Sequence, residues 1–422
     1  MSFATFILYL ICVFIRPQDW VPFLIGKPLI NIFGVATIIF LFFESSGKPE
    51  GKRLVRSPQS WLMVCFFLSI LMSHIAHHYF TGLINAFTQF YPTVILFFVI
   101  LNAINSEKRL KTAVWIITLI MGLLVLQGMY QRHNGFGWAD QVITSQGDEK
   151  GGMIYRINWV GIFADPNDLA LTFVIGIGLL LPYIFSNVNF LLRLISTGLV
   201  AFLGYGIFLT NSRGGQIALM AAMLYFFVRK TKRFILGGIL GSGAVAAVLL
   251  FGPSRMSSLS SSEDSAAARL DLWYGGLQIF KSNPVFGRGF GMFMDTMPQT
   301  AHNSYVLAVA ELGFVGLFLW VAMIYISMKG LMAVQSTNKG LANHALGIQS
   351  ALIGFSAAAF FLSRTYVILP FMLFAMAGSL TWIATKSDTA TPPLKFNGKD
   401  AFKVFLLSAG VILAVMIMIR GR

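Results

Sequence analysis

Long apolar runs alternate with short polar segments along the whole chain of 422 residues. Such runs are typical of helices that cross a membrane, because about 20 apolar residues span the hydrocarbon core of a bilayer. The runs lie near residues 3–15, 29–43, 60–76, 84–104, 112–130, 168–185, 189–210, 214–229, 234–251, 303–328, 344–363, 366–384 and 402–419. The first two runs are short, and the last is the weaker part of the count. The sequence therefore predicts an all-α polytopic membrane protein with twelve or thirteen transmembrane helices.

The composition indicates lipid as the main solvent of the chain. Hydrophobic residues make up 56% of it and charged residues only 11%, whereas soluble domains carry about 25% charged residues. The first run lacks the basic start and the small-residue cleavage site of a secretory signal, so we expect it to remain as a helix. No internal repeat is evident, and we treat residues 1–422 as a single membrane domain.

Clusters of Lys and Arg predict the orientation of the runs. Each of three clusters follows an even-numbered run, so all three lie on one side, which the positive-inside rule assigns to the cytoplasm. The clusters are Lys48, Lys52, Arg53 and Arg56; Lys108, Arg109 and Lys111; and Arg229, Lys230, Lys232 and Arg233. Two long loops, 131–167 and 252–303, then face the periplasm of a bacterial inner membrane. A thirteenth span would place Arg420 and Arg422 on that outer side too.

The second outer loop, 252–303, is the largest insertion between apolar runs. It opens with a Ser-rich stretch, Ser257 to Ser265, and continues as an amphipathic segment, 266–281. The apolar positions of that segment recur at helical spacing. They are Leu270, Trp273, Leu277 and Phe280. We therefore predict a helix that lies on the outer membrane surface.

The formal net charge of +15 exceeds what cytoplasmic loops require. Nine cations lie on the predicted outer side: Arg132, Lys150, Arg156, Arg213, Arg255, Arg269, Lys281, Arg288 and Arg364. Any one of them can be explained by contact with lipid headgroups. As a set they indicate an anionic substrate, because a guanidinium group matches phosphate oxygens with a rigid, permanently charged fork. We expect membrane lipid as a partner and no nucleic acid.

Arg213 is the most informative of these cations. It lies in Leu-Thr-Asn-Ser-Arg-Gly-Gly, between two apolar runs that are joined with almost no loop. The two glycines that follow allow a tight turn or the close approach of a ligand. Ser212, directly before it, can donate a further hydrogen bond. The alternative is an interfacial arginine that extends to lipid headgroups.

A second group of polar residues surrounds the predicted surface helix. Arg269 and Asp271 precede Trp273, and Arg288 lies in a glycine-rich segment, Asn-Pro-Val-Phe-Gly-Arg-Gly-Phe-Gly. A basic side chain near the start of a helix is disfavoured by the helix dipole, which indicates a separate role for Arg269. The glycine spacing resembles a phosphate-binding loop, and an ordinary loop is an equally good interpretation.

His302 begins the third group, His-Asn-Ser-Tyr, at the outer end of the tenth run. A histidine has the near-neutral pKa that suits a general base for a sugar hydroxyl. The alternative is a capping or interfacial residue, with Asn303 or Ser304 as the helix cap.

We predict no metal site and no cofactor. His74, His77 and His78 cluster without Asp, Glu or Cys nearby, and Cys12 and Cys65 lie in separate apolar runs. Metal sites in proteins usually combine such residue types at closer spacing.

Taken in order, these segments resemble the O-antigen ligase and polymerase superfamily. The resemblance rests on Ser-Arg-Gly-Gly, Arg-x-Asp-x-Trp, Asn-Pro-x-Phe-Gly-x-Gly-Phe-Gly, and His-Asn-Ser-Tyr followed by Glu-Leu-Gly. Arg16-Pro17 and the segment 163–168, Phe-Ala-Asp-Pro-Asn-Asp, resemble the ligase branch. The resemblance extends from about residue 10 to residue 385.

This resemblance implies a helical membrane glycosyltransferase of the broad C-type (GT-C-like) architecture. It implies a glycan on undecaprenyl diphosphate as the donor and lipid A–core as the acceptor, in lipopolysaccharide biosynthesis. By position, Arg213 and Arg269 match the diphosphate-binding arginines, and His302 matches the catalytic histidine. Arg288 lies in the variable part of the glycine motif and is a further candidate for diphosphate binding. The supporting residues are expected to be Ser212, Asp271, Asn303 and Tyr305.

The chemistry expected of such an enzyme is an inverting transfer that needs no metal. Two arginines can stabilise the departing diphosphate by electrostatics alone while His302 takes the proton of the acceptor hydroxyl. A polymerase that extends the lipid-linked glycan would use the same donor, and a transferase that modifies a protein is a further alternative. A transporter of lipid-linked sugars would instead show repeat symmetry and charged helices near the bilayer midplane. A structural subunit would leave the outer arginines unexplained.

Overall fold

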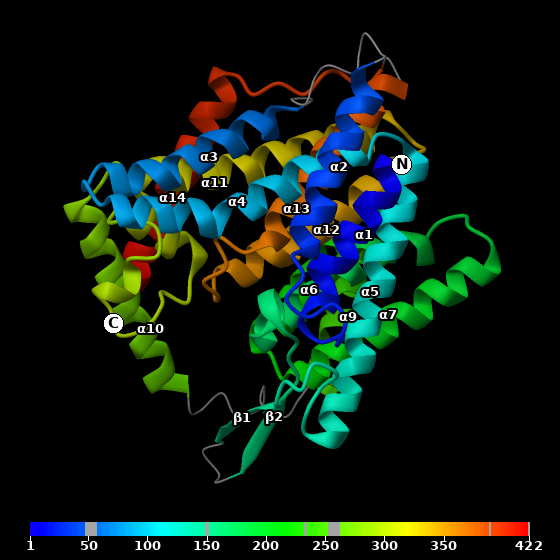
Figure 1. The fold of residues 1–422 in the computed structure, drawn as a ribbon, viewed down its shortest axis with the longest axis horizontal. Helices are drawn as coiled ribbons and strands as arrows, with labels where there is room; N and C mark the ends of the chain where they lie inside the picture. Colours follow the sequence, from blue (N-terminus) through cyan, green and yellow to red (C-terminus); the bar gives the residue numbers. More distant parts are fainter. Residues whose placement is uncertain (47–56, 148–151, 232–233, 252–261, 388–389, 421–422) are drawn as a thin grey trace.

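The computed structural model describes residues 1–46, 57–147, 152–231, 234–251, 262–387 and 390–420 (Figure 1). Its helices are α1 (Ser2–Phe14), α2 (Leu29–Ser46), α3 (Pro58–Ile75), α4 (Phe80–Ala103), α5 (Glu107–Asn134), α6 (Pro166–Ile184), α7 (Phe190–Thr210), α8 (Arg213–Thr231), α9 (Phe234–Phe251), α10 (Ser262–Ser282), α11 (Ser304–Thr337), α12 (Ala342–Ala359), α13 (Ile368–Ser387) and α14 (Gly398–Arg420). Short 3-10 helices are η1 (Pro17–Asp19), η2 (Gly161–Phe163) and η5 (Phe293–Asp295).

Some residues used to predict the orientation lie outside the described part of the chain. They are Lys48, Lys52, Arg53, Arg56, Lys150, Lys232, Arg233, Arg255, Arg422 and residues 257–261 of the Ser-rich stretch.

Each predicted apolar run coincides with a helix, and the predicted surface helix is α10. Within the described residues, eight helices are long and apolar enough to cross a membrane: α3, α4, α5, α6, α7, α11, α13 and α14. This is fewer than the twelve or thirteen predicted. Among the others, α1 and the apolar part of α2 are short, and α12 carries polar residues that are buried among other helices. The eight long apolar helices indicate a multi-pass membrane protein.

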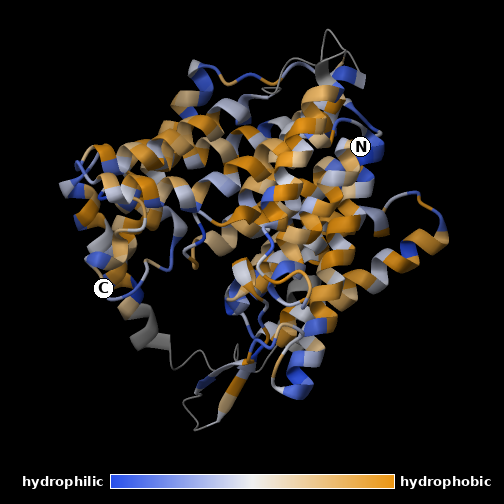
Figure 2. Ribbon diagram, viewed as in Figure 1, coloured by the Kyte–Doolittle hydropathy of each residue, from blue (hydrophilic) through white to orange (hydrophobic). Residues whose placement is uncertain are grey.

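The bundle also contains strands that the sequence analysis did not predict. Strand β1 (Thr144–Gly147) pairs antiparallel with β2 (Met153–Arg156), so that Thr144 lies opposite Arg156. This hairpin lies within the first long loop and extends below the helices in Figure 1. Figure 2 shows apolar residues along the helices and polar residues concentrated in the connecting segments.

The helix ends meet in the pattern that the basic loops predict. One cavity is lined by residues at three helix ends: Lys111 near the start of α5, Lys230 at the end of α8 and Asn343 at the start of α12. The Lys230 ammonium donates to the Asn343 side chain at 3.2 Å. We call the opposite end, where α6, α8 and α11 begin, the outer end. Met418 of α14 lines a cavity there, so the final helix finishes on the side where a thirteenth span would place it.

The glycine-rich segment after α10 docks on a break in α11. That break lies at Gly313, where φ is 65° and ψ is −164°. The backbone N–H of Arg288 donates to the Ala310 carbonyl at 2.9 Å, and that of Gly289 donates to the Glu311 carbonyl at 3.0 Å. His77 Nε2 donates to the Gly287 carbonyl at 2.8 Å. Because these amide groups already have partners, the geometry favours an ordinary docked loop over a phosphate-binding loop.

We predict that Gly287→Ala destabilises this docked loop. Gly287 has a φ of +69°, and an added Cβ would overlap the backbone of Glu311 and Leu312. A strained backbone of this kind costs about 1–3 kcal/mol. The measurement is thermal unfolding in detergent, with Gly198→Ala as the control, because a Cβ there meets no atom within 4 Å. Equal melting temperatures for the two variants would contradict the docking of this loop.

Candidate functional site

A cavity of about 690 Å³ opens at the outer end of the bundle. It is enclosed by the β-hairpin, the starts of α6 and α8, α10, and the connections before α11 and after α12. Its lining residues are Gln146, Arg156, Asn167, Asn211, Arg213, Gly214, Ile217, Arg269, Leu270, Trp273, His302, Phe361, Leu362 and Met418. Three of the four outer candidates for catalysis and diphosphate binding thus line one cavity: Arg213, Arg269 and His302.

Arg213 is placed in the cavity by the tight junction between α7 and α8. Asn211 ends α7 in the left-handed conformation, with a φ of 48°, and Ser212 caps α8 by accepting from the Gly215 N–H at 3.0 Å. Gly215 packs against Ala170 of α6, which leaves no room for a larger residue. Arg213 Nε is buried and has no hydrogen-bond partner among the described residues. This guanidinium group is therefore held at the helix start with donor capacity left for a ligand.

Arg269 approaches the same space from α10. Burial, reinforced by the positive charge of Arg213, lowers its pKa from the usual value. An arginine remains charged after such a shift, so two like charges lie close together in a partly desolvated cavity. The described lining residues include no carboxylate. This arrangement is unfavourable for the protein alone and favourable for an anionic ligand.

His302 lies between α10 and α11 in the left-handed conformation, with a φ of 48°. Such a backbone is uncommon outside glycine and is often found at functional sites. The next residue, Asn303, caps α11 by accepting from the Tyr305 N–H at 2.9 Å and the Val306 N–H at 3.2 Å. Trp273 of α10 donates to the Ala301 carbonyl at 2.9 Å. His302 is thus held from both sides by its neighbours along the chain.

The electrostatic surroundings keep the His302 ring neutral. Burial, followed by the positive charges of Arg269 and Arg364, lowers the pKa of His302 from its ordinary value of 6.5, while Asp165 acts in the opposite direction. A neutral imidazole has a free nitrogen lone pair at neutral pH. His302 can therefore accept a proton from a ligand in the cavity.

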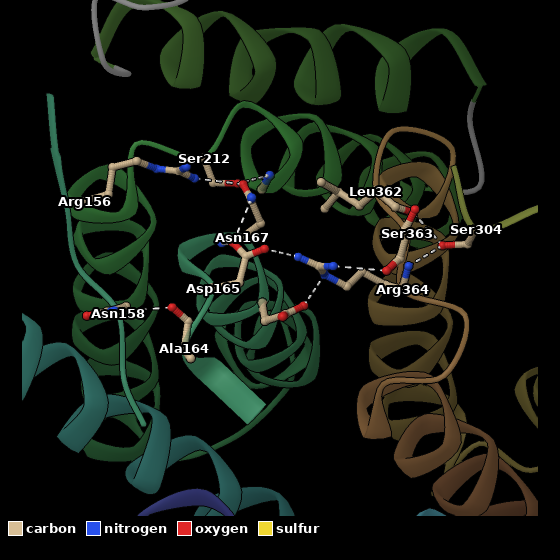
Figure 3. Close-up of polar contacts among 12 residues, drawn as sticks. Arg156, Asn158, Ala164, Asp165, Asn167, Ser212, Ser304, Leu362, Ser363 and Arg364 are labelled. Atoms are coloured by element: carbon tan, nitrogen blue, oxygen red, sulfur yellow. Dashed lines mark hydrogen bonds and ion pairs between the residues drawn. The ribbon is translucent and has the colours of Figure 1, made fainter. Parts of the chain in front are cut away.

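A polar network joins the elements around the cavity (Figure 3). Arg364, after α12, forms ion pairs with Asp165 and Asp168 at the start of α6. Its backbone N–H donates to the Ser304 hydroxyl at 2.7 Å, which connects it to the start of α11 two residues after His302.

The network continues from Asp165 to the arginine side of the cavity. Asp165 accepts from the Asn167 backbone N–H at 2.8 Å. The Asn167 side-chain oxygen then accepts from Arg156 at 2.9 Å and from the Ser212 hydroxyl at 2.7 Å. One chain of contacts therefore links the His302 segment to the residue that precedes Arg213.

Three of the predicted residues lie elsewhere. Arg288 is exposed on the docked loop and is not among the cavity-lining residues, and Asp271 is exposed on α10. The Tyr305 hydroxyl points away into the bundle, where it donates to the Ser356 carbonyl at 3.3 Å. Ser212 and Asn303 lie beside the cavity and cap α8 and α11.

The sequence analysis did not assign Arg156 or Asn167 to the site. In the sequence, Arg156 was one outer cation among several. The β-hairpin brings it to the cavity, and the pairing of its two strands is not evident from the sequence periodicity. Asn167 belongs to the segment 163–168 that carries part of the family resemblance, which was an available signal. No group of three or more His, Cys, Asp or Glu able to hold a metal ion lies within the described residues.

We predict that Arg364→Ala destabilises the outer end strongly. Removing this arginine leaves Asp168 buried, with only 11% of its side chain exposed, and loss of one member of a buried pair costs about 3–5 kcal/mol. Thermal unfolding in detergent measures the effect, and the double variant Arg364→Leu/Asp168→Asn should recover part of it. Arg193→Ala, at an exposed position on α7, is the control. A melting temperature equal to that of the control would show that the pair contributes nothing.

Comparison with known proteins finds a match that includes part of the site. Residues 198–321 match the family model described as O-antigen ligase. This segment extends from α7 into α11 and contains Arg213, Arg269 and His302. No curated protein matches the chain. The segment that supplies these three cavity residues is therefore similar to the O-antigen ligase family.

Proposed function

We propose that the protein is an O-antigen ligase, a glycosyltransferase that moves O-antigen from undecaprenyl diphosphate to lipid A–core. One observation carries the proposal: Arg156, Arg213 and Arg269 line the same cavity, whose described lining includes no carboxylate. Several guanidinium groups that line one cavity match a ligand that carries several phosphate oxygens. The matched family domain, which includes ligase enzymes, covers two of these arginines and His302.

The arginines act on the leaving group. As the bond between the anomeric carbon and the diphosphate oxygen breaks, negative charge grows on the diphosphate. Arg213 and Arg269, already fixed by α8 and α10, stabilise that charge without rearrangement. Arg156 supports the same ligand from the hairpin, where Asn167 and the Thr210 carbonyl hold its side chain at 2.9 Å and 3.0 Å. Positioning and electrostatics replace a metal ion in this mechanism.

His302 acts on the acceptor. Its neutral ring removes the proton of the acceptor hydroxyl as the oxygen attacks the anomeric carbon. Attack opposite the departing diphosphate inverts the configuration at that carbon. The protonated ring then lies near Asp165, whose negative charge favours the imidazolium form. Undecaprenyl diphosphate leaves with the bonding electron pair, so the reaction is balanced without a cofactor.

The proposed site faces the periplasm of a bacterial inner membrane. The cytoplasmic assignment of the basic loops places the outer end of the bundle on that side. Leu270, Phe361 and Met418 add apolar surface to the cavity beside the arginines. Such a mixed lining suits a ligand that has a charged head and a polyprenyl chain in lipid.

An O-antigen polymerase is the second candidate, because the matched domain is shared by O-antigen ligases and polymerases. A polymerase would bind the same lipid diphosphate in the arginine cavity and use the same base. The two functions differ only in the acceptor, which is lipid A–core for a ligase and a lipid-linked glycan for a polymerase. Assays with both acceptors distinguish them.

We predict that Arg213→Ala and Arg269→Ala each lower the transfer rate about 10²–10³-fold, as loss of one fixed transition-state donor usually does. His302→Ala should lower it about 10²–10⁴-fold through loss of the general base. The measurement is glycan transfer from undecaprenyl diphosphate to lipid A–core by purified protein.

Lys281→Ala is the matched control for these variants, since Lys281 is an exposed cation on α10 outside the cavity lining. Its rate should equal that of the wild type. Normal turnover by Arg213→Ala or Arg269→Ala would remove that arginine from the site, and normal turnover by His302→Ala would exclude it as the base.

We also predict that substitutions of Arg364 and Asp165, which form an ion pair, shift the pH dependence of the transfer rate in opposite directions. The neutral form of His302 is active, so the rate falls as the pH decreases through its pKa. Arg364→Gln removes a positive charge that lowers the pKa of His302, so the fall in rate on the acid side moves to higher pH. Asp165→Asn removes a negative charge that raises the pKa of His302, so the fall in rate moves to lower pH. The measurement is kcat/KM against pH. If both variants shift the acid side of the profile in the same direction, the Asp165–Arg364 pair has only a structural role.

A further inference from the structure

A second cavity, of about 520 Å³, lies at the outer end of the same bundle. It is formed by the connection between α1 and α2, by α4, by η2 and by the connection between α12 and α13. Its lining residues are Arg16, Gln18, Asp19, Lys27, Pro28, Leu29, Ile30, Asn31, Gln89, Pro92, Thr93, Ile162, Tyr366, Val367 and Ile368. None of these residues lines the arginine cavity.

The ion pair between Asp165 and Arg364 joins two connections that each contribute residues to both cavities. Along the chain, Asp165 lies between Ile162 of the second cavity and Asn167 of the arginine cavity. Arg364 likewise lies between Leu362 of the arginine cavity and Tyr366 of the second. Both cavities therefore adjoin, along the chain, the residues of the polar network that includes Asp165 and Arg364.

The second cavity offers hydrogen-bonding groups to a polar ligand. Gln18 is 8% exposed, and its side-chain oxygen is buried without a hydrogen-bond partner among the described residues. Asn31, Gln89 and Thr93 add two further carboxamides and a hydroxyl. Carboxamides both donate and accept, as the hydroxyl groups of a sugar require. An unpartnered buried oxygen costs free energy that a ligand hydroxyl can recover.

A polar face on α4 leads into this cavity. Thr81, Asn85, Thr88 and Gln89 are all exposed, although α4 is one of the helices apolar enough to cross a membrane. Positions 81, 85, 88 and 89 share one helical face. Polar residues in a membrane helix usually face protein or a water-filled cavity instead of lipid. This face therefore indicates that a polar ligand or water lies beside the outer half of α4.

The remaining lining residues define the charge and the lipid character of the ligand. Asp19 pairs with Arg16 at 2.5 Å and cancels its charge, so the exposed Lys27 supplies the net positive charge of the cavity. Directly after Asn31, α2 exposes an apolar face that includes Ile32 and Val35. The cavity thus suits a weakly anionic saccharide whose lipid chains continue along α2.

A cluster of three tryptophans follows the cavity residue Asp19. The ring of Trp20, next to Asp19, lies 6.2 Å from the ring of Trp138 and 6.2 Å from that of Trp159. Tryptophan is enriched where the hydrocarbon core meets water. The exposed Trp138, beside Trp20, therefore favours a position of this segment near the membrane–water boundary.

We infer that this second cavity binds the acceptor, an anionic saccharide lipid, while the arginine cavity binds the donor. The inference rests on the proposed function, since a transfer between two lipid-linked saccharides needs two sites on the outer side. The arrangement brings the acceptor to His302 from the side of Arg364 and the donor from the side of Arg213. The same chemistry describes lipid A–core and a lipid-linked glycan.

The variant Lys27→Glu/Gln89→Leu tests the inference without touching the arginine cavity. It reverses the net charge of the second cavity and removes one carboxamide from α4. With the donor saturating, the KM for the acceptor should rise about tenfold, because one charge pair and one hydrogen bond are lost. The KM for the donor and the kcat should equal those of the wild type. Measurement with lipid A–core and with a lipid-linked glycan as acceptors identifies which of them uses the cavity.

The matched control is Lys281→Glu/Thr197→Leu, which makes the same kinds of change at exposed positions outside both cavities. An acceptor KM equal to that of the control, for both acceptors, would overturn the inference while the transfer activity of the wild type still stands.

A binding measurement separates this inference from the proposed function. Lipid A–core and, separately, a short lipid-linked glycan are added to protein in phosphatidylcholine nanodiscs, and binding is measured by native mass spectrometry without any transfer. We expect one of them to bind the wild type and to bind Lys27→Glu/Gln89→Leu about tenfold more weakly. Equal binding to both proteins, or no binding of either lipid to the wild type, would overturn the inference. Binding without transfer would instead contradict the proposed function alone.

Discussion

Arg364 reaches from the connection after α12 to two carboxylates at the start of α6, and the outer end of the bundle depends on this ion pair. The same arginine bonds to Ser304 at the start of α11. Asp165 extends the contact through Asn167 to the junction of α7 and α8. Segments that are more than a hundred residues apart in sequence are thereby fixed relative to one another. Without that constraint, the segments that carry His302 and the cavity arginines would not be held in fixed positions relative to one another.

The ion pair also explains how the cavity stays positive. Asp165 and Asp168 are the acids nearest in sequence to the lining residue Asn167, and free carboxylates there would neutralise the arginines. Their binding to Arg364 keeps them engaged outside the lining. Arg213 and Arg269 are left with each other as neighbours, an arrangement that lowers the stability of the protein alone and favours an anion. Under the proposed function, the stability that this arrangement costs is offset when an anionic ligand binds.

Much of this architecture could be predicted from the sequence. Apolar periodicity placed each helix, and the amphipathic spacing of Leu270, Trp273 and Leu277 placed α10. The Ser-Arg-Gly-Gly and His-Asn-Ser-Tyr segments predicted the tight junction before α8 and the cap of α11, because junctions and caps have local signatures. Features that depend on long-range packing were not predicted. The hairpin that presents Arg156 has no strong local pattern, and α12 carries polar residues, such as Gln349, that are fully buried. The glycine-rich segment has the spacing of a phosphate-binding loop, yet its amides bond to α11.

The central claim is that the arginine cavity holds the diphosphate of a lipid-linked donor. A structure of the protein in nanodiscs with undecaprenyl diphosphate, determined by electron cryo-microscopy, tests this claim most directly. The account predicts diphosphate density between Arg213 and Arg269, within about 3 Å of both guanidinium groups, with His302 facing the free end of the ligand. Diphosphate density outside this cavity, or in the cavity beside Lys27, would contradict it.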